Sequence, residues 1–391
     1  MLNTPFSPWP SFSADEIDAV SALLRSGRVN YWTGEEGRNF EREFAAWCGV
    51  RHALALANGT VAIDLALKVL GIGHGDEVIV TPRTFLASAS CIVNAGARPV
   101  FADVDRDSQN ITPETIEPAL SKRTKAILCV HLAGWPCEMD GIRAIAERRG
   151  LLVIEDCAQA VGARYRGRSV GSLGDAGTWS FCQDKIISSA GEGGMLTVDS
   201  SELWGKAWSY KDHGKSWAAV YEREHARGFR WVHESFGTNW RMTEIQAAIG
   251  RIQLGKIDAW HAARRENARA ILSAAHDCPV FRVPQVPDHI EHAWYKAYVF
   301  IESARLKQGW SQLRVTSEIA ARGVPCDVGS CSEVYLEKAF DGTGFRPPAR
   351  LPVARELGET SLMFLVHPTL TADEIARTCQ AIREVGSMAL A

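Results

Sequence analysis

The sequence lacks the features that mark membrane, secreted and nucleic-acid-binding proteins. No segment approaches the roughly 20 consecutive apolar residues that a membrane-spanning helix needs. Residues 1–10 have neither the basic start nor the apolar core of a signal peptide. The formal net charge is −3 and no run of basic residues occurs, so nothing in the sequence favours nucleic acid as a partner. We therefore expect a globular protein of the cytoplasm.

Cysteine spacing excludes the common zinc and redox motifs. The chain has ten cysteines, and no two of them form a Cys-x-x-Cys pair. Cys129, Cys157 and Cys182 lie in or beside apolar, strand-like runs, where cysteine usually acts as a small buried side chain. We expect a reduced setting and no metal site.

The length and the hydrophobic pattern predict a large α/β domain and a smaller one. The chain has 391 residues, more than one simple core usually holds. From residue 51 onward, short apolar runs alternate with helical segments, which is typical of a mainly parallel sheet covered by helices on both faces. The expected strands are 53–57, 77–80, 99–102, 126–130, 151–154 and 195–198, and the main expected helices between them are 61–70, 86–95 and 139–149.

The second half of the chain is expected to form a bridge and a small α+β domain. A long helix is predicted from residue 243 to about residue 276, preceded by an irregular, aromatic-rich region over 204–241. The small domain should contain a strand near 295–301, a helix near 310–322 and a last helix capped by Thr371-Ala-Asp-Glu374. We place the large domain at 1–255 and the small domain at 256–391.

One lysine is the strongest candidate for chemistry. Lys185 lies in the segment 178–194, between an aromatic-rich strand and a loop of small residues, and the next cation along the chain is Lys206. A lysine that is isolated in apolar and small surroundings suits Schiff-base chemistry. The alternative is an ordinary surface lysine whose stem lies on the protein while its charge reaches water.

Other candidates follow the predicted strands, because ligands of such sheets bind beyond the carboxyl ends of the strands. Asn58-Gly-Thr60 begins a helix, where a phosphate would meet free amides, although an ordinary helix cap explains it equally well. Asp156 ends a strand and needs a cation or strong donors if it is buried, with capping as the alternative. The remaining candidates each have a structural alternative as well: Phe85, Gln159, Ser180 and Asn239.

Taken in order, these segments resemble the DegT/DnrJ/StrS family of pyridoxal phosphate (PLP)-dependent nucleotide-sugar aminotransferases. That family has the aspartate-aminotransferase-like fold known as fold type I. The resemblance covers nearly the whole chain and depends on several short segments in a shared order. These segments are Asn58-Gly-Thr-Val-Ala62, Thr81-Pro-Arg-Thr-Phe85, Val130-His-Leu-Ala-Gly134, Ile154-Glu-Asp-Cys-Ala-Gln159, Gly174-Asp-Ala-Gly177, Trp179-Ser-Phe181 with Lys185, Gly191-Glu-Gly-Gly194 and Asn239-Trp-Arg-Met-Thr-Glu-Ile-Gln246.

The resemblance implies a role for each matching position. Lys185 would bind the cofactor covalently and later carry the proton, and Asp156 would keep the pyridine nitrogen protonated, which makes the ring an electron sink. Asn239 would reach the cofactor phosphate of the neighbouring subunit, so a homodimer is implied. The other implied cofactor contacts are Gly59, Thr60, Val61 and Ser180 at the phosphate, Phe85 stacked on the ring, and Gln159 near its face or phenolic oxygen.

The implied reaction moves an amino group from an amino acid, most simply L-glutamate, to a keto group of a nucleotide-linked deoxysugar. The product would be an amino sugar for a surface polysaccharide, such as a lipopolysaccharide O-antigen, or for a glycosylated metabolite. Two alternatives stay open, namely dehydratase or lyase chemistry with PLP, and a regulatory protein without catalysis. Relatives that act as dehydratases carry histidine in place of the lysine, and this chain keeps Lys185.

Two departures from the family pattern concern the approach to the lysine and the sugar contacts. Cys182-Gln-Asp184 stands where the family often has proline or small residues, and Gly329-Ser-Cys-Ser-Glu-Val-Tyr335 replaces the usual Tyr-x-x-Pro-x-His segment. The candidate sugar contacts are Tyr31, Trp32, Lys215 and Tyr335.

Overall fold

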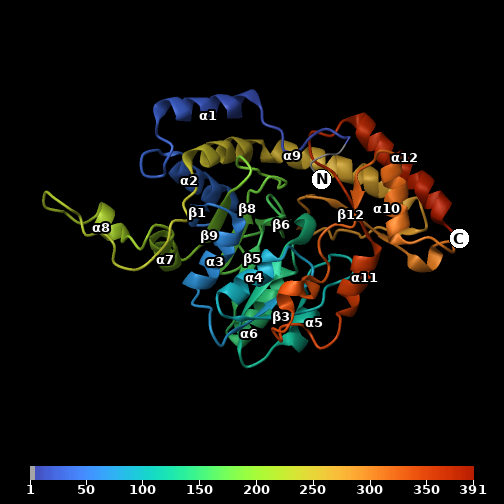
Figure 1. The fold of residues 1–391 in the computed structure, drawn as a ribbon, viewed down its shortest axis with the longest axis horizontal. Helices are drawn as coiled ribbons and strands as arrows, with labels where there is room; N and C mark the ends of the chain where they lie inside the picture. Colours follow the sequence, from blue (N-terminus) through green and yellow to red (C-terminus); the bar gives the residue numbers. More distant parts are fainter. Residues whose placement is uncertain (1–4) are drawn as a thin grey trace.

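The computed structural model describes residues 5–391, so the first four residues of the segment considered for a signal peptide lie outside it. Its centre is a sheet in the order β1-β9-β8-β5-β4-β2-β3 (Figure 1). Within the described residues only β9 runs against its neighbours, and the other strands share one direction. The prediction of a mainly parallel sheet is confirmed. The strands are β1 (His52–Leu56), β2 (Glu77–Val80), β3 (Arg98–Phe101), β4 (Thr124–Val130), β5 (Leu152–Asp156), β8 (Ala176–Ser180) and β9 (Gly194–Val198).

Helices cover both faces of this sheet, because the central residues of its strands are mostly apolar and buried. On one face Phe40 and Phe44 of α2 pack against Trp179 and Phe181, with ring centroids 5.1–5.7 Å apart. On the other face α3 packs against β8 and β9 and contacts α4 and α7. The helices of this part are α2 (Glu36–Cys48), α3 (Gly59–Val69), α4 (Ala87–Asn94), α5 (Pro113–Ile116), α6 (Met139–Arg149), α7 (Ser201–Lys211) and α8 (Trp217–Tyr221).

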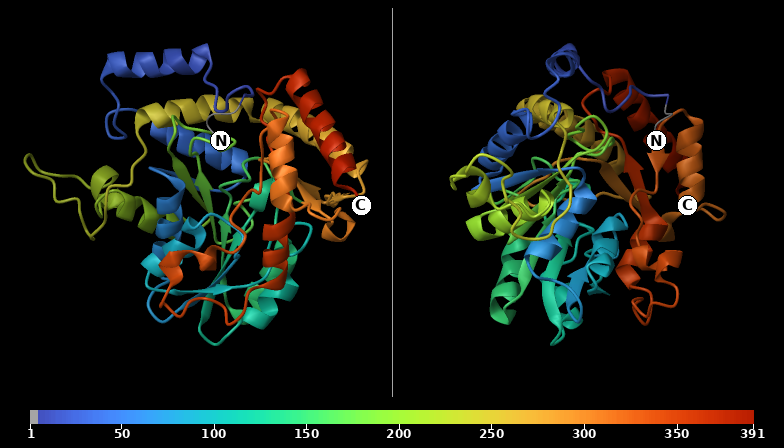
Figure 2. Two further views of the ribbon diagram at one scale, coloured as in Figure 1. Left: turned by 45° about the vertical axis from the view of Figure 1, so that its right-hand side comes forward. Right: turned by 60° about the vertical axis from the view of Figure 1, so that its left-hand side comes forward.

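One long helix, α9 (Glu244–His276), lies against both parts of the protein (Figures 1 and 2). Thr243 accepts a hydrogen bond from the Gln246 amide, and the Gln246 side chain accepts one from the Thr243 amide, so a capping box starts the helix where the sequence predicts. The proposed domain boundary at residue 255 falls inside this helix and stays a prediction.

A second, antiparallel sheet in the order β10-β12-β14-β13 forms the core of the C-terminal part. The last helix begins at the predicted Thr371 capping box. A small third sheet joins the segment before β8 to the segment after α9. The elements are β10 (Phe281–Arg282), β12 (Ala297–Ile301), β13 (Cys326–Asp327), β14 (Ser361–Phe364), α10 (Gln312–Ala321), α11 (Pro352–Thr360), α12 (Ala372–Ala389), and in the third sheet β6 (Arg164–Tyr165), β7 (Arg168–Ser169) and β11 (Ile290–Glu291).

Short 3₁₀ turns connect several of these elements, and none of the helices in residues 5–391 has the length and apolarity to cross a membrane. The 3₁₀ turns are η1 (Glu117–Ala119), η2 (Leu132–Gly134), η3 (Ser303–Arg305), η4 (Val334–Leu336) and η5 (Lys338–Phe340).

The expectation of an irregular region over 204–241 is wrong for its first part. Helix α7 continues to Lys211, and it starts because the Ser200 hydroxyl accepts a hydrogen bond from the Leu203 amide. Trp204 and Trp208 both pack against Trp217, with ring centroids 5.0 Å apart in each pair. Trp204 and Trp208 are four residues apart, so both lie on one face of the helix and reach the same partner ring.

The N-terminal segment crosses from one part to the other. Helix α1 (Ala14–Ser26) lies along α9, while the residues before it contact the C-terminal part (Figure 1). The Thr369 hydroxyl donates to the Pro8 carbonyl at 2.8 Å, and the Trp9 ring stacks on His367. This crossing brings Trp9 to the site described next.

Candidate active site

A narrow cradle lies where α3 begins beside the end of β8. A Cβ atom added at Gly59 would lie 2.6 Å from the Ser180 Cβ, so only glycine fits there. The amides of Gly59 and Thr60 lie in the first turn of α3, where an amide has no acceptor within the helix, so they can bind an anion. The Val61 amide donates to the Asn58 side chain at 3.0 Å, so Val61 offers no free amide. We call Gly59, Thr60 and Ser180 the phosphate cradle.

Asp156 is a buried carboxylate without a cationic partner. It is 5% exposed, and its oxygens accept hydrogen bonds from the Ser88 hydroxyl at 2.8 Å and the Ala158 amide at 3.0 Å. Among residues 5–391, no lysine, arginine or histidine forms an ion pair with it. A buried carboxylate is costly unless a cation and hydrogen bonds compensate it, so a ligand cation fits this position.

Gln159 lies three residues after Asp156 in the chain, and Phe85 lies three residues before Ser88, which binds the Asp156 carboxylate. The Gln159 side chain is buried, and its Oε1 accepts a hydrogen bond from the Ala133 amide at 2.8 Å. Phe85 follows β2, and its ring is 70% exposed, which leaves a face open for stacking. Ser88, which no sequence motif indicated, connects Asp156 to Thr84 through a 2.9 Å hydrogen bond between the two hydroxyls.

Lys185 lies in the loop after β8, and its side chain is 15% exposed. Its backbone is held at both ends, because its amide donates to the Cys182 carbonyl at 3.0 Å and its carbonyl accepts from the Trp9 indole at 2.9 Å. Trp9 is 176 residues away in the sequence, so no local pattern could reveal it. The Lys185 ammonium lies 3.9 Å from the Asp184 carboxylate and 5.1 Å from the centre of the Tyr295 ring.

The unusual approach to the lysine has a structural explanation. Asp184 accepts a hydrogen bond from the Tyr295 hydroxyl, which ties the lysine loop to the C-terminal part. Burial acts to raise the pKa of Asp184, but the Lys185 charge and the Tyr295 hydrogen bond outweigh it and hold that pKa below its usual value. Asp184 is therefore a carboxylate that fixes Lys185 and Tyr295 together.

The expectation that Lys185 is an isolated charge is wrong in three dimensions. The ammonium of Lys296 lies 4.8 Å from the centre of the same Tyr295 ring. Arg264 of α9 is fully buried behind it and donates hydrogen bonds to the Trp294 and Tyr295 carbonyls at 3.3 Å. The spacing of cations along the chain could not show this, because the fold brings them from α9 and from the start of β12.

These observations fit PLP. The cradle offers amides and a hydroxyl to a phosphate, Asp156 offers an uncompensated carboxylate to a protonated ring nitrogen, and Lys185 offers a fixed primary amine. The strands that carry Asp156 and Ser180 are adjacent and parallel, so both residues lie at the same edge of the sheet.

The four candidate sugar contacts fall into two groups. Lys215 lies 4.0 Å above the Trp32 ring and forms a 3.0 Å ion pair with Asp212, while Lys211 lies 4.1 Å above the neighbouring Tyr31 ring. Tyr31 is buried, and its hydroxyl donates to Glu41. In the described part of the chain, this cluster makes no contact with Lys185.

Tyr335 does not fit the expected sugar contact. It is 1% exposed and packs against Phe101, and its hydroxyl donates to Glu333 and accepts from the Leu351 amide. Its ring and its hydroxyl are thus both used inside the protein, so the structure corrects this expectation.

Asn239 lies at the base of an exposed arm. Residues 213–238 project from the body of the molecule around α8 (Figures 1 and 2). Asn239 is exposed and pairs through its backbone with Asp212, and the next residue accepts a hydrogen bond from the Ala57 amide at the end of β1. The arm carries Phe229, Trp231 and Phe236, which are 75%, 80% and 99% exposed.

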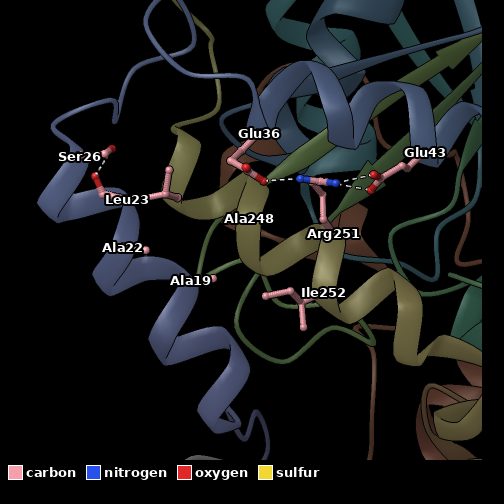
Figure 3. A pocket seen from close by; sticks show the side chains of 9 residues that line it. All are labelled: Ala19, Ala22, Leu23, Ser26, Glu36, Glu43, Ala248, Arg251 and Ile252. Carbon is pink, nitrogen blue, oxygen red and sulfur yellow. Dashed lines mark hydrogen bonds and ion pairs between the residues drawn. The ribbon is translucent and has the colours of Figure 1, made fainter.

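Two other features, a surface groove and a cluster of possible metal ligands, are weaker candidates for a functional site because their charged groups already have partners. The groove in Figure 3, about 580 Å³ between α1, α2 and α9, has Arg251 bound to both Glu36 and Glu43 at 2.6 Å, so that charge is already compensated. His131, Glu155 and Cys157 lie together as metal ligands can. However, the oxygens of Glu155 accept hydrogen bonds from His131 and from the amides of Gly171, Leu173 and Gly174.

Comparisons with known proteins agree with this geometry. The model of the DegT/DnrJ/EryC1/StrS aminotransferase family matches residues 10–383. The X-ray structure of an aminotransferase from Psychrobacter cryohalolentis is 59% identical, with a TM-score of 0.97, and the match covers 98% of this chain and 100% of that one.

Two relatives of known name are nucleotide-sugar enzymes. The dTDP-3-amino-3,4,6-trideoxy-alpha-D-glucose transaminase of Streptomyces venezuelae is 34% identical over 95% of this chain and 92% of its own length. The GDP-perosamine synthase of Escherichia coli O157:H7 is 33% identical over 96% of both chains.

Proposed function

Because the chain belongs to the DegT/DnrJ/EryC1/StrS family of PLP-dependent sugar aminotransferases, we propose that it aminates a keto group of a nucleotide-linked deoxysugar. We further propose L-glutamate as the amino donor and an amino sugar for a surface polysaccharide or a glycosylated metabolite as the product. The observation that carries the proposal is the pairing of a fixed amine at Lys185 with an uncompensated buried carboxylate at Asp156.

The residues of this chain would hold the cofactor at its phosphate, at its ring nitrogen and at the face of its ring. Gly59, Thr60 and Ser180 would bind its phosphate, and Asp156 would keep a proton on its ring nitrogen. PLP, when bound, supplies an electron sink that makes the α-proton of the amino donor acidic. Phe85 has a ring face open for stacking against the cofactor. Gln159, three residues after Asp156, would lie near the face or phenolic oxygen of the cofactor ring.

Lys185 has two further tasks in this proposal. Its Nζ removes the α-proton of the amino donor and later returns a proton during amination of the sugar. Asp184 and Trp9 keep the amine in place, since one contacts the side chain and the other binds the backbone carbonyl. The 15% exposure of the side chain limits the water that could compete for the proton.

Lysine replacement tests the assignment directly. Lys185→Ala should lose the near-visible absorbance of the lysine-bound cofactor, its fixation by borohydride, and turnover. Lys206→Ala is the matched control, because Lys206 forms only an exposed ion pair with Glu202. A Lys185→Ala protein that retains the absorbance and turnover would show that the assignment is wrong.

Product analysis tests the reaction class. The protein is incubated with PLP, L-glutamate and 3-keto or 4-keto deoxysugars linked to dTDP, GDP or UDP, and 2-oxoglutarate and the sugar product are measured by mass spectrometry. We expect an amino sugar and one 2-oxoglutarate per amine formed. A product that has lost water without gaining nitrogen would instead identify a dehydratase.

We also propose that the active unit is a homodimer in which Asn239 reaches the partner's cofactor. The exposed aromatic side chains of the arm support this, because such side chains usually lie at interfaces. Phe236→Asp should shift the protein towards monomer in light scattering, whereas Phe12→Asp, at an aromatic outside the arm, should not.

Mixed dimers test the shared site. Neither Lys185→Ala nor Asn239→Asp should be active alone, but a heterodimer of the two contains one intact site and should regain activity. Lys185→Ala mixed with Asp156→Ala is the control, because both positions belong to the same subunit and no intact site can form. Equal activity of the two mixtures would contradict a shared site.

A further inference from the structure

Two buried cations near Lys185 have no anionic partner that binds them directly. Lys296 is 7% exposed, and within residues 5–391 its ammonium has neither a hydrogen bond nor an ion pair. Arg264 is 1% exposed, and its Nε and Nη2 atoms have no hydrogen-bond partner in the described chain. Buried cations of this kind are costly unless an anion compensates them.

The nearby carboxylate is already in use. Asp184 accepts the Tyr295 hydroxyl hydrogen bond and lies beside the Lys185 ammonium, so its charge serves that lysine. His367 adds no positive charge to this group, because burial, assisted by Arg264 and Lys296, lowers its pKa to about 3. Three cations therefore share one carboxylate around the Tyr295 ring.

We propose that Lys296, supported by Arg264, binds a carboxylate group of a substrate next to Lys185. The Lys185 and Lys296 ammonium groups lie 5.1 and 4.8 Å from the centre of one ring, so both amines border the Tyr295 side chain. The anion at Lys296 is not the cofactor phosphate, because we place that phosphate in the cradle between α3 and β8.

The residues around Lys296 match the needs of a carboxylate site. Burial, opposed by Asp184 and reinforced by Arg264 and Lys185, lowers the pKa of Lys296 to about 8, and the group is charged at neutral pH. A bound carboxylate would gain strong, charge-assisted hydrogen bonds in a site with little water. Arg264 is a positioning residue here, since its bonds to the Trp294 and Tyr295 carbonyls fix the segment that carries Lys296.

A binding experiment on the PLP-loaded protein tests this inference, which depends on the proposed function. Glutarate, which has no amino group to transfer, stands for the amino donor, and glucuronate stands for an acidic sugar; calorimetry measures the affinity of each. We expect at least one to bind, and Lys296→Met to weaken it by about tenfold or more. Lys307→Met is the control, because that lysine is exposed and should not affect binding.

The outcomes separate the inference from the proposed function. Binding of glutarate assigns the carboxylate to the amino donor, and binding of glucuronate alone assigns it to the sugar. An unchanged affinity in Lys296→Met with the cofactor absorbance intact overturns the carboxylate site only. Absence of that absorbance in the natural protein overturns the proposed function itself.

A second variant covers the case in which Lys296→Met loses the cofactor. Lys296→Arg keeps the positive charge and should retain glutarate binding, while neutral glutaramide should bind at least about tenfold more weakly. Equal affinity for glutarate and glutaramide would overturn the inference, because a carboxylate site must distinguish charge.

Discussion

The close approach of α3 to β8 makes Gly59→Ala an informative substitution. The new Cβ would lie 2.6 Å from the Ser180 Cβ and 3.1 Å from the Ser180 Cα. Ser180 belongs to a central strand bonded to β9, so it cannot move cheaply. Overpacking of this kind costs about 1–3 kcal/mol. The gain of alanine over glycine in a helix is at most about 1 kcal/mol and offsets only part of that cost.

The strain should appear in both stability and cofactor affinity. If α3 moves away from Ser180 to relieve the contact, the cradle opens, and binding the phosphate must reverse that movement. We expect the dissociation constant for PLP to rise about tenfold, which corresponds to about 1.4 kcal/mol. The melting temperature of the cofactor-free protein should fall by a few degrees, about the shift expected for 1–2 kcal/mol in a large domain.

Absorbance titration with PLP and thermal unfolding by circular dichroism measure the two effects. Gly255→Ala is the matched control, because Gly255 also lies in a helix and an added Cβ there meets no atom within 4 Å. That variant should keep its affinity and gain up to about 1 kcal/mol of stability. A Gly59→Ala protein with a lowered melting temperature but an unchanged dissociation constant would refute the placement of the phosphate in this cradle.

Three further predictions concern buried titratable side chains. Burial lowers the pKa of both His292 and His367 to about 3. The unfolded chain takes up protons at these residues below about pH 6.5, while the folded protein does not until about pH 3. As the pH is lowered from about 6.5 to about 3, the free energy of unfolding should therefore fall by about 1.4 kcal/mol per pH unit for each histidine. Urea titrations at pH 7 and 5 measure this decline, which should be smaller in His292→Asn and would be equal if burial were not the cause. Lys211→Met should destabilise the fold by about 3–5 kcal/mol, because it leaves the Glu41 carboxylate without its 3.0 Å partner. Adding Glu41→Gln should restore much of that loss in the same titration, and no recovery would contradict the pairing. Asp156→Asn should fold normally but turn over about a hundredfold or more slowly with glutamate and a keto sugar; near-natural turnover would exclude its role.

The regular part of the fold could be predicted because its sequence signals are local. Apolar strands that alternate with helices define the central sheet, and the helix expected over 139–149 is α6 with the same bounds. The start of the long helix at Thr243 and the cap at Thr371 also lie where the sequence places them. Helix α7 was harder to predict because it lies at the start of a long aromatic-rich run, and Tyr335, a candidate sugar contact, is buried.

The cofactor side of the candidate site could be predicted for a related reason. Gly59 follows β1, Asp156 and Ser180 end β5 and β8, and parallel strands bring their carboxyl ends to one edge. Trp9 and Lys296 follow no such rule, because the N-terminal segment and the start of β12 reach Lys185 only through tertiary contacts. A sequence pattern therefore indicated the residues that we propose hold the cofactor and missed those that we propose face the substrate.

The unpaired buried charges also separate a proposed cofactor side of the site from a proposed substrate side. Within residues 5–391, Asp156 is a buried carboxylate without a cationic partner, and Lys296 with Arg264 is a pair of buried cations without an anion of their own. Each is unfavourable in the empty protein, and each is compensated by a ligand of opposite charge. A protonated cofactor ring at Asp156 and a substrate carboxylate at Lys296 would remove both costs, with Lys185 between them as the group that moves the proton. On this reasoning, binding of the two ligands should stabilise the protein separately, and Lys296→Met should reduce the stabilisation by glutarate without changing that by PLP.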